Sequence, residues 1–241
     1  MGVEGVLWAA PIADVIGIFI AGTLAVRFYR RLGASEPTKE PKLSEMIMDS
    51  KPGVIITIAR EHGSAGKEIG RLVAERLGVP YYYKEMLAIA AKKSGLSEKY
   101  LDQINHRDEE GAMRELYLSS APAEYAIKAQ RQALEEIAKH GSCVIIGRAA
   151  DYVLRKNPHV LRVFISAPAD YKIRKLGEMY GDTPAEAKKS SRKSDRNRAS
   201  YYNTVSGLEW GARENYDLCI DSSIGNEATA DIIADYAKKS A

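Results

Sequence analysis

The sequence predicts an α/β protein built on a doubly wound parallel sheet. Three observations predict it. Short apolar runs, typical of buried strands, alternate with longer segments whose apolar residues recur at helical spacing. The runs are continuous in apolar residues, as strands covered on both faces should be. Gly78 and Gly141 end two of the predicted helices.

The predicted elements begin at Gly53 and follow one another in order. The strands are predicted at 54–59, 81–83, 143–146, 160–165 and 218–220. The helices are predicted at 66–77, 84–94, 123–139, 168–180, 184–205 and 227–239. The polar stretch 96–119 is predicted to be a helical insertion. Ligands bind such sheets at the carboxyl ends of the strands, so 60–67, 147–151 and 166–170 should surround one crevice.

The N-terminus has a different composition. Residues 6–26 contain one ionisable side chain, Asp14, and predict a transmembrane helix within 1–32. About 21 residues give about 32 Å of helix, enough for a hydrocarbon core of about 30 Å. Apolar side chains favour insertion by about 5 kcal/mol, and Asp14 opposes it by about 3 kcal/mol. The alternative is a helix packed on the following domain.

The arginines after this helix predict its orientation. Arg27, Arg30 and Arg31 place the next domain on the cytoplasmic side, tethered to the inner face of the cell membrane. Residues 33–52 have the composition of a linker, rich in proline and charge. The domain itself is predicted at 53–241.

Overall composition is that of an ordinary globular protein, with 28% charged and 45% hydrophobic residues. A net charge of +3 does not by itself indicate nucleic acid, and no nucleic-acid partner is expected. Cys143 and Cys219 lie in strand-like runs and are predicted to be buried, reduced thiols. No Cys/His spacing resembles a zinc site.

The turn between the first predicted strand and the helix at 66–77 carries the strongest functional signal. Glycines let the backbone approach an anion, helix-start amides point at it, and a lysine neutralises it. The sequence therefore predicts a nucleoside triphosphate site. Its residues are Gly63, Ser64, Ala65, Gly66, Lys67 and Glu68.

This turn departs from the usual phosphate-loop pattern at two positions. Glu61 stands where glycine is expected, and Glu68 stands where a serine or threonine hydroxyl normally holds Mg²⁺. The metal ligands are therefore left unassigned. The alternative is an ordinary glycine-rich turn with Lys67 in solvent. His62 is interpreted as a loop residue rather than a catalyst.

Arg148 directly follows a buried strand-like run. A guanidinium at that position should enter the crevice and grip a phosphate with two hydrogen bonds. The alternative is a surface arginine paired with Asp151.

A second basic segment lies in the helix predicted at 184–205. Arg192, Asp195 and Arg198 are spaced by three residues and predict one face of a lid that closes over phosphates. The alternative is a solvated charged face. Three aromatic residues nearby are interpreted as packing the lid against the body rather than stacking on a base: Tyr201, Tyr202 and Trp210.

Several segments together resemble the cytidylate kinase-like family. They are 58–70, 80–82, 144–152, 161–165, 195–199 and 201–220, within about 190 residues from Gly53 to the end. The resemblance implies a P-loop nucleoside monophosphate kinase fold with a helical acceptor-binding insertion and a helical lid. It also implies transfer of the ATP γ-phosphate to CMP or dCMP with Mg²⁺.

The resemblance also implies roles for individual residues. Gly63, Gly66 and Lys67 would bind ATP phosphates. Lys67, Arg192 and Arg198 would act at the transferred group. The acceptor would meet Arg148, Asp195 and either Arg107 or Arg114. Tyr83 and Ala149 stand where relatives have aspartate, which leaves the acceptor's identity open.

The N-terminal segment gives a second resemblance. Residues 10–14 and the following arginines are similar to the final helix of multidrug-and-toxin-extrusion transporters, which implies a fusion joint and a membrane association. The sequence leaves two alternatives to a kinase. One is a nucleotide-binding regulatory module, with little turnover, attached to a membrane protein. The other is a module that binds RNA or anionic lipid through the lid.

Overall fold

The computed structural model describes residues 53–106 and 112–240, all within the unit Ser44–Ala241. At its centre is a five-stranded sheet in the order β2-β3-β1-β4-β5, and every neighbouring pair is parallel. The predicted membrane helix, the linker and Arg107 lie outside the described residues. No helix in the described ranges is both apolar and long enough to cross a membrane.

The strands and helices follow the predicted order. The strands are β1 Ile55–Arg60, β2 Tyr81–Tyr82, β3 Cys143–Ile146, β4 Val160–Ser166 and β5 Leu218–Asp221. The helices are α3 Gly66–Leu77, α4 Glu85–Ser94, α5 Glu98–His106, α6 Ala112–Leu118, α7 Ala121–Lys139, α8 Ala150–Val153, α9 Ala169–Tyr180, α10 Pro184–Ser206 and α11 Asn226–Ser240. Two short 3-10 turns, Arg213–Asn215 and Ser222–Ile224, flank β5.

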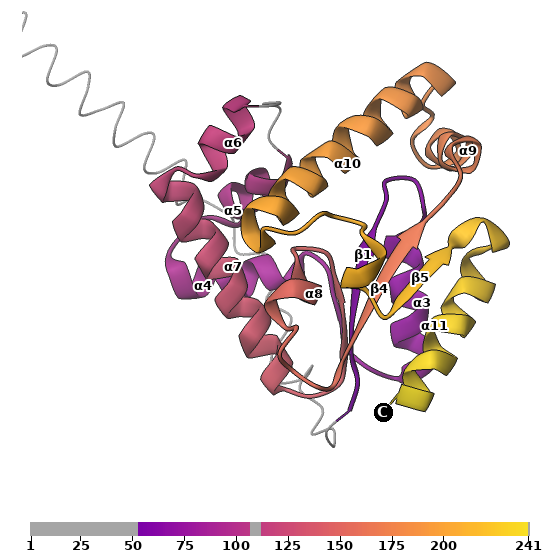
Figure 1. The fold of residues 1–241 in the computed structure, drawn as a ribbon, viewed down its shortest axis with the longest axis horizontal. Helices are drawn as coiled ribbons and strands as arrows, with labels where there is room; N and C mark the ends of the chain where they lie inside the picture. Colours follow the sequence, from indigo (N-terminus) through magenta and orange to yellow (C-terminus); the bar gives the residue numbers. More distant parts are fainter. Residues whose placement is uncertain (1–52, 107–111, 241) are drawn as a thin grey trace, which may run out of the picture. The chain divides into compact units, whose positions relative to one another are not determined.

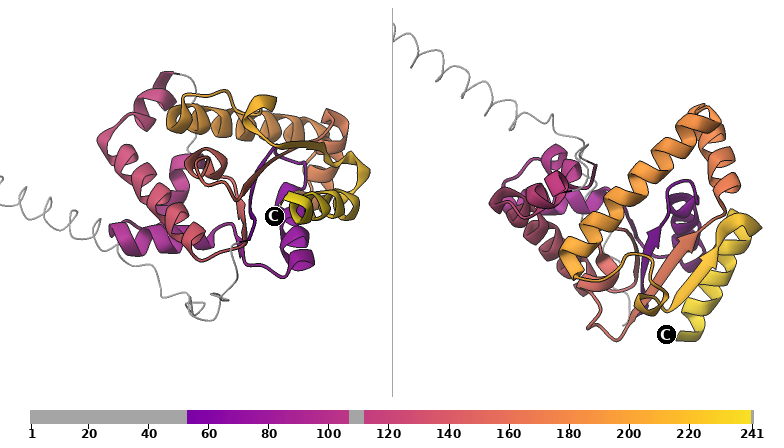
Figure 2. Two further views of the ribbon diagram at one scale, coloured as in Figure 1. Left: turned by 60° about the horizontal axis from the view of Figure 1, so that its bottom comes forward. Right: turned by 45° about the horizontal axis from the view of Figure 1, so that its top comes forward.

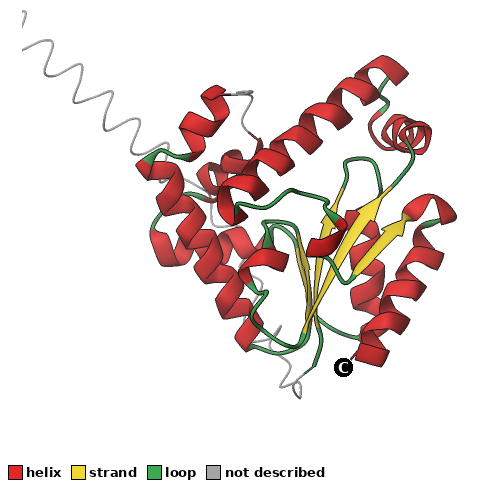
Figure 3. Ribbon diagram, in the orientation of Figure 1, coloured by secondary structure: helices red, strands yellow, loops and turns green. Residues whose placement is uncertain are grey.

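Helices cover both faces of the sheet (Figure 1, Figure 3). On one face α3 and α11 pack against alternate strand residues, including Ile56, Ile58 and Val163. On the other face α4, α5, α7 and α8 pack against the residues between them, including Ile55 and Ile145. This double burial explains why the strands are continuous apolar runs in the sequence.

The chain leaves the sheet in opposite directions at the ends of β1 and β3. The turn after β1 leads into α3 on one face, and the turn after β3 leads into α8 on the other. A crevice therefore opens at the carboxyl ends of these neighbouring strands, where ligands bind in doubly wound sheets.

Helix α10 extends over this crevice (Figure 1, Figure 2). Thr183 caps its start: the Thr183 hydroxyl accepts from the Glu186 amide, and the Glu186 carboxylate accepts from the Thr183 amide in return. The helix packs against α9 at its start and against α5 and α6 further along. The predicted lid is therefore a helix that joins α9 to the insertion.

Two features differ from the sequence-based predictions. Cys143 is buried as predicted, but Cys219 is exposed, so that prediction was wrong. The reason is that β5 is an edge strand whose residues alternate in burial, and Cys219 lies on its uncovered side. The short helix α8 was not predicted, since four residues are too few for a helical period to be recognised in the sequence.

Candidate functional site

The turn from Glu61 to Ala65 wraps around the N-terminus of α3. The first backbone hydrogen bond of this helix runs from Ile69 N to Ala65 O at 3.0 Å. The amides of residues 66–68 precede it, and helix-start amides have no acceptor within their own helix. Ala65 has a left-handed φ of 57°. The turn predicted to bind a triphosphate lines a cavity of about 650 Å³ that is also bounded by α9 and α10, and amides at a helix start suit an anion.

Lys67 extends along this cavity toward Tyr83. Its Nζ lies 5.1 Å from the centroid of the Tyr83 ring, and both residues line the cavity. The ring therefore holds the ammonium by a cation–π interaction. Lys67 is exposed and lines the cavity, and its role in phosphate binding stays a prediction.

Glu61, one departure from the phosphate-loop pattern, anchors the turn to the neighbouring loop and helix. One of its carboxylate oxygens accepts from Lys172 Nζ at 3.0 Å and from the Ala167 amide at 3.1 Å. Gly63 lies so close to α9 that an added Cβ would be 3.0 Å from Lys172. The ion pair thus neutralises the charge of Glu61, and the glycine permits the close approach of α9.

Glu68, the second departure, is engaged on the surface of α3. Its two oxygens accept from Arg71 at 2.6 and 3.3 Å, and these hydrogen bonds, with the charge of Arg71, lower its pKa. In the described part of the chain, no group of three or more His, Cys, Asp or Glu residues could hold a metal ion. Because Glu68 stands where the customary P-loop magnesium site has a hydroxyl ligand, the residues of this turn do not fit that site.

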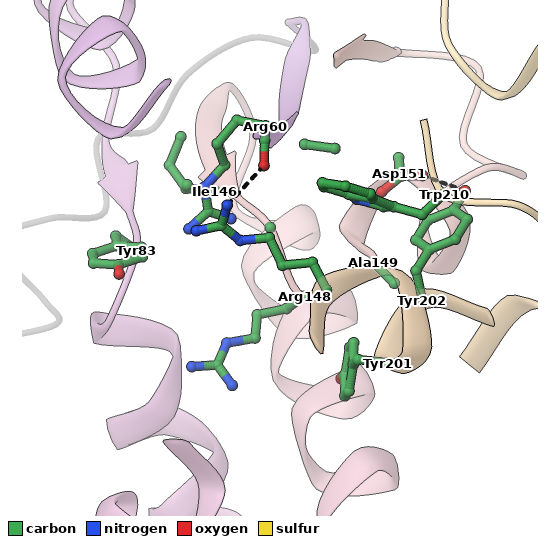
Figure 4. Close-up of a pocket in the computed structure, with 12 residues that line it drawn as sticks. Arg60, Tyr83, Ile146, Arg148, Ala149, Asp151, Tyr201, Tyr202 and Trp210 are labelled. Atoms are coloured by element: carbon green, nitrogen blue, oxygen red, sulfur yellow. Dashed lines mark hydrogen bonds between the residues drawn. The ribbon is translucent and has the colours of Figure 1, made fainter. Parts of the chain in front are cut away.

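A second, smaller cavity of about 50 Å³ adjoins the first between β1, β3 and α10. Three arginines line it: Arg60, Arg148 and Arg198. Figure 4 shows Tyr83 on one side and Trp210, Tyr202 and Tyr201 on the other, with Arg60 and Arg148 between them. Three guanidinium groups in one small cavity form a site for an anion.

Arg60, the last residue of β1, was missed by the sequence-based interpretation. Its side chain passes two glycines. A Cβ added to Gly66 would lie 2.6 Å from Arg60 Cβ, and a Cβ added to Gly147 would collide with Arg60 Nη1. Burial, followed by the charge of Arg198, lowers the pKa of Arg60 to about 9. The available signal was its position, a charged residue that ends an otherwise apolar strand next to the phosphate-binding turn.

Arg148 lies in an unusual turn. Gly147, Arg148 and Ala149 all have left-handed φ angles, of 74°, 61° and 52°. Such strain in non-glycine residues concentrates at functional sites. The largely buried guanidinium donates to Asp102 of α5 at 2.7 Å and to Leu101 O at 3.3 Å. Arg148 thus enters the cavity as predicted, and its carboxylate partner is Asp102 rather than Asp151.

Asp151 is buried at the edge of the same cavity. It accepts a hydrogen bond of 2.7 Å from the Tyr202 hydroxyl. Burial raises the pKa of Asp151 to about 6, while the hydrogen bond from Tyr202 opposes this rise. The Asp151 carboxylate is therefore hydrogen-bonded to α10, whereas Arg148 and Arg198 form their ion pairs with Asp102 and Asp195.

Asp195 and Arg198 connect α10 to the phosphate-binding turn. Asp195 Oδ1 accepts from the His62 amide at 2.7 Å and from Arg198 Nη1 at 3.1 Å. Arg198 Nη1 also donates to Arg60 O at 3.1 Å. The ring of His62 lies parallel to that of Tyr180, with centroids 6.5 Å apart. His62 is thus a loop residue whose backbone binds the lid helix.

The structure places the remaining candidate residues outside both cavities. Arg192 is exposed on α10 and lines neither of them. Arg114 is buried and donates to Asn197 O of α10 at 3.1 Å, so it joins the insertion to the lid helix. The segment 166–170 contributes the Ala167 amide to Glu61 but lines neither cavity.

The aromatic residues after Arg198 pack against the body of the domain. Tyr201 is buried and donates to Gln130 of α7 at 3.0 Å. Trp210 packs edge-on against Phe164 of β4, with ring centroids 5.3 Å apart. These contacts agree with the packing role favoured from the sequence.

The two cavities meet at three residues. Arg60, Tyr83 and Arg198 line both of them. A parallel sheet with a glycine-rich turn after its central strand, and a helix over the crevice, define an α/β protein of the P-loop kinase type.

Comparison with known proteins identifies the family. The profile of the cytidylate kinase-like family matches residues 55–224, and the chain belongs to this family. It is 25% identical over 179 residues to a cytidylate kinase of Pyrococcus horikoshii, covering 72% of this chain and 82% of that protein. An uncharacterized protein from Eubacterium ventriosum has a similar structure, with a TM-score of 0.60 and 26% identity, covering 77% of this chain and 98% of that one. Family and fold together support a kinase-type phosphotransferase.

Proposed function

We propose that this protein transfers the γ-phosphate of ATP to CMP, dCMP or a similar small acceptor. The observation that carries the proposal is the junction of the two cavities. One has the amides and lysine that suit a triphosphate, the other has three guanidinium groups that suit a smaller anion, and both share Arg60, Tyr83 and Arg198.

The reaction requires no covalent enzyme intermediate. An oxygen of the acceptor phosphate forms a bond to the γ-phosphorus as the bond to the β–γ bridging oxygen breaks. The electron pair stays on the bridging oxygen, so ATP and a nucleoside monophosphate become ADP and a nucleoside diphosphate. Catalysis then depends on positioning and on cations around the transferred group.

Each candidate residue receives a role in this proposal. Gly63, Ser64, Ala65, Gly66, Lys67 and Glu68 form the donor turn. Lys67 and Arg198 stabilise the transferred phosphoryl group, and Arg192 joins them only if α10 moves, because it is exposed here. Arg148 serves the acceptor side, and Asp195, which lines neither cavity, serves it by holding Arg198. Arg114 holds the insertion to α10, and Arg107 remains a candidate acceptor contact in the part of the chain not described.

Mg²⁺, which the family implies, would accompany the nucleotide and partly neutralise its phosphates. Because Glu68 stands where the customary hydroxyl ligand would be, we assign no protein ligand to Mg²⁺. The tether to the inner face of the cell membrane through residues 6–26 is likewise a proposal, based on the sequence of that segment.

The direct test is release of ADP from ATP with a panel of acceptors: CMP, dCMP and UMP. We expect release that depends on the acceptor, and its loss in the Lys67→Ala variant without loss of the fold. Lys92→Ala, at an exposed position on α4, is the matched control. Nucleotide binding with no release for any acceptor would instead support the nucleotide-binding regulatory module.

A further inference from the structure

We propose that Arg60 is a catalytic residue whose guanidinium touches the phosphoryl group during its transfer. This inference rests on the proposed function and adds to it a residue that the phosphate-binding turn does not contain. Arg60 is the last residue of β1 and lines both the donor and the acceptor cavity. Arg60 is thus one of the three side chains at the junction between the two cavities, with Tyr83 and Arg198.

Two glycines from different loops make room for Arg60. An added Cβ on Gly66 would lie 2.6 Å from Arg60 Cβ and 2.7 Å from Arg60 Cγ, and an added Cβ on Gly147 would collide with Nη1. The side chain therefore runs from the donor turn to the loop after β3 along a path that only glycines leave open. Such confinement places the guanidinium before substrates arrive, which strengthens its effect on a transition state.

Arg60 differs from its neighbours in its charge partners. Arg148 is paired with Asp102, and Arg198 is paired with Asp195. Within residues 53–106 and 112–240, no carboxylate forms an ion pair with Arg60. Burial and the positive charge of Arg198 lower the pKa of Arg60, because both disfavour its charged form. An anion bound beside Arg60 would stabilise that charged form.

The ring of Tyr83 contacts the cationic groups of both Arg60 and Lys67. The ring centroid of Tyr83 lies 5.6 Å from Arg60 Cζ and 5.1 Å from Lys67 Nζ. A neutral aromatic ring attracts both cations without ion-pairing either, so both keep their hydrogen-bond donors for a ligand. We therefore assign Tyr83 as the positioning residue for Arg60 and Lys67.

The chemistry of the transfer explains what Arg60 contributes. Negative charge spreads over the three equatorial oxygens of the phosphoryl group as the bond to the bridging oxygen breaks. Lys67 reaches the group from the donor side, while Arg60 and Arg198 stand where the two cavities join. A planar guanidinium can bind two of these oxygens at once, which a lysine cannot.

The test compares Arg60→Met and Arg60→Lys with Arg131→Met, which changes an exposed arginine on α7 that lines neither cavity. We expect Arg60→Met to lower kcat by roughly 10²–10³-fold with a smaller change in the KM for ATP. Arg60→Lys should lose less and guards against a folding defect. A kcat for Arg60→Met close to that of Arg131→Met, in a wild-type enzyme that turns over, would overturn the proposal.

A second measurement does not depend on turnover. Inorganic tripolyphosphate is titrated calorimetrically into each variant. We expect Arg60→Met to bind it at least about tenfold more weakly than Arg131→Met does, and equal affinities would refute the role of Arg60. If Arg60→Met binds weakly while the wild type releases no ADP with any acceptor, the proposed function fails and the anion site at Arg60 stands.

The role of Tyr83 is tested separately. Tyr83→Phe keeps the ring and should leave kcat nearly unchanged, whereas Tyr83→Leu removes the ring and should lower kcat by about tenfold. Equal effects of the two substitutions would contradict a role for the ring.

Discussion

The backbone amide of His62 donates a hydrogen bond of 2.7 Å to the carboxylate of Asp195, so the phosphate-binding turn is joined to helix α10. The same carboxylate oxygen accepts from Arg198, and the other lies 3.7 Å from Lys172 Nζ. One side chain thus connects the turn, the lid helix and α9. Binding of phosphates at the turn and the position of Arg198 should therefore be linked.

Substitution of Asp195 tests this link. Asp195→Ala leaves the His62 amide and Arg198 without their acceptor and should reduce the free energy of unfolding by about 1–3 kcal/mol. Asp195→Asn retains an oxygen for the amide but removes the charge, so it should preserve more stability and still lower kcat. Urea denaturation and steady-state kinetics measure both effects. Equal stability of the wild type and Asp195→Ala would contradict a structural link.

The buried Asp151 predicts a pH dependence of stability. Its pKa is raised to about 6 in the folded state, so the folded protein binds more protons than the unfolded chain between about pH 4 and pH 6. This contribution to stability is complete below about pH 4 and is lost as the pH rises through 6. Asp151→Asn keeps an acceptor for Tyr202 and should gain about 2–3 kcal/mol over the wild type at pH 7.

The measurement is denaturant unfolding of both proteins from pH 4 to pH 8. Asp195 also has a raised pKa, because of burial, and contributes in the same direction in both proteins. The difference between the two stability curves therefore isolates Asp151. A difference that stays constant over this range would mean that Asp151 titrates as an ordinary carboxyl.

The left-handed conformation of Ala65 predicts a stabilising substitution. Alanine at φ 57° is strained by about 1–2 kcal/mol, and glycine is not. Ala65→Gly should therefore raise the melting temperature, although the added freedom of the unfolded chain offsets about 0.4–1 kcal/mol. Ala74→Gly, in the interior of α3, should lower the melting temperature, because glycine there reduces the free energy of unfolding by about 1 kcal/mol. The same sign for both would contradict the assigned backbone conformation.

The ion pair between Arg148 and Asp102 predicts an effect on acceptor affinity. Asp102 neutralises a guanidinium that lines the smaller cavity. Asp102→Asn should strengthen the positive potential there and lower the KM for an anionic acceptor by roughly three- to tenfold. Asp170→Asn, an exposed change on α9, is the control. A raised KM would show that Asp102 positions Arg148 more than it opposes the acceptor.

Much of the fold could be predicted because local patterns determine it. Strands β1, β3 and β4 are buried on both faces, so their apolar runs are unambiguous. Helix α3 begins at Gly66 and ends at Leu77 as predicted, because Gly78 closes it in a left-handed conformation. The order of strands in the sheet depends on contacts distant in sequence, and the sequence alone did not predict it.

The site could be predicted only in part, for similar physical reasons. Lys67, Arg148 and Arg198 follow recognisable turns or helix spacings and do meet at the crevice. Asp102 lies 46 residues from Arg148, so no local pattern connects them. The spacing of three residues predicted that Arg192 and Arg198 share one face of the helix. Six residues separate them, however, and on a helix of 3.6 residues per turn their side chains point about 120° apart.

The most direct test of the two joined cavities is the affinity of a bisubstrate analogue, with adenosine and cytidine connected by five phosphates. If the donor turn and the arginine cavity share one junction, this molecule occupies both at once. We predict one analogue bound per chain, at least about 100-fold more tightly than ATP alone, because the second contact is intramolecular. Binding no tighter than that of ATP, for this analogue and for its uridine counterpart, would contradict the account.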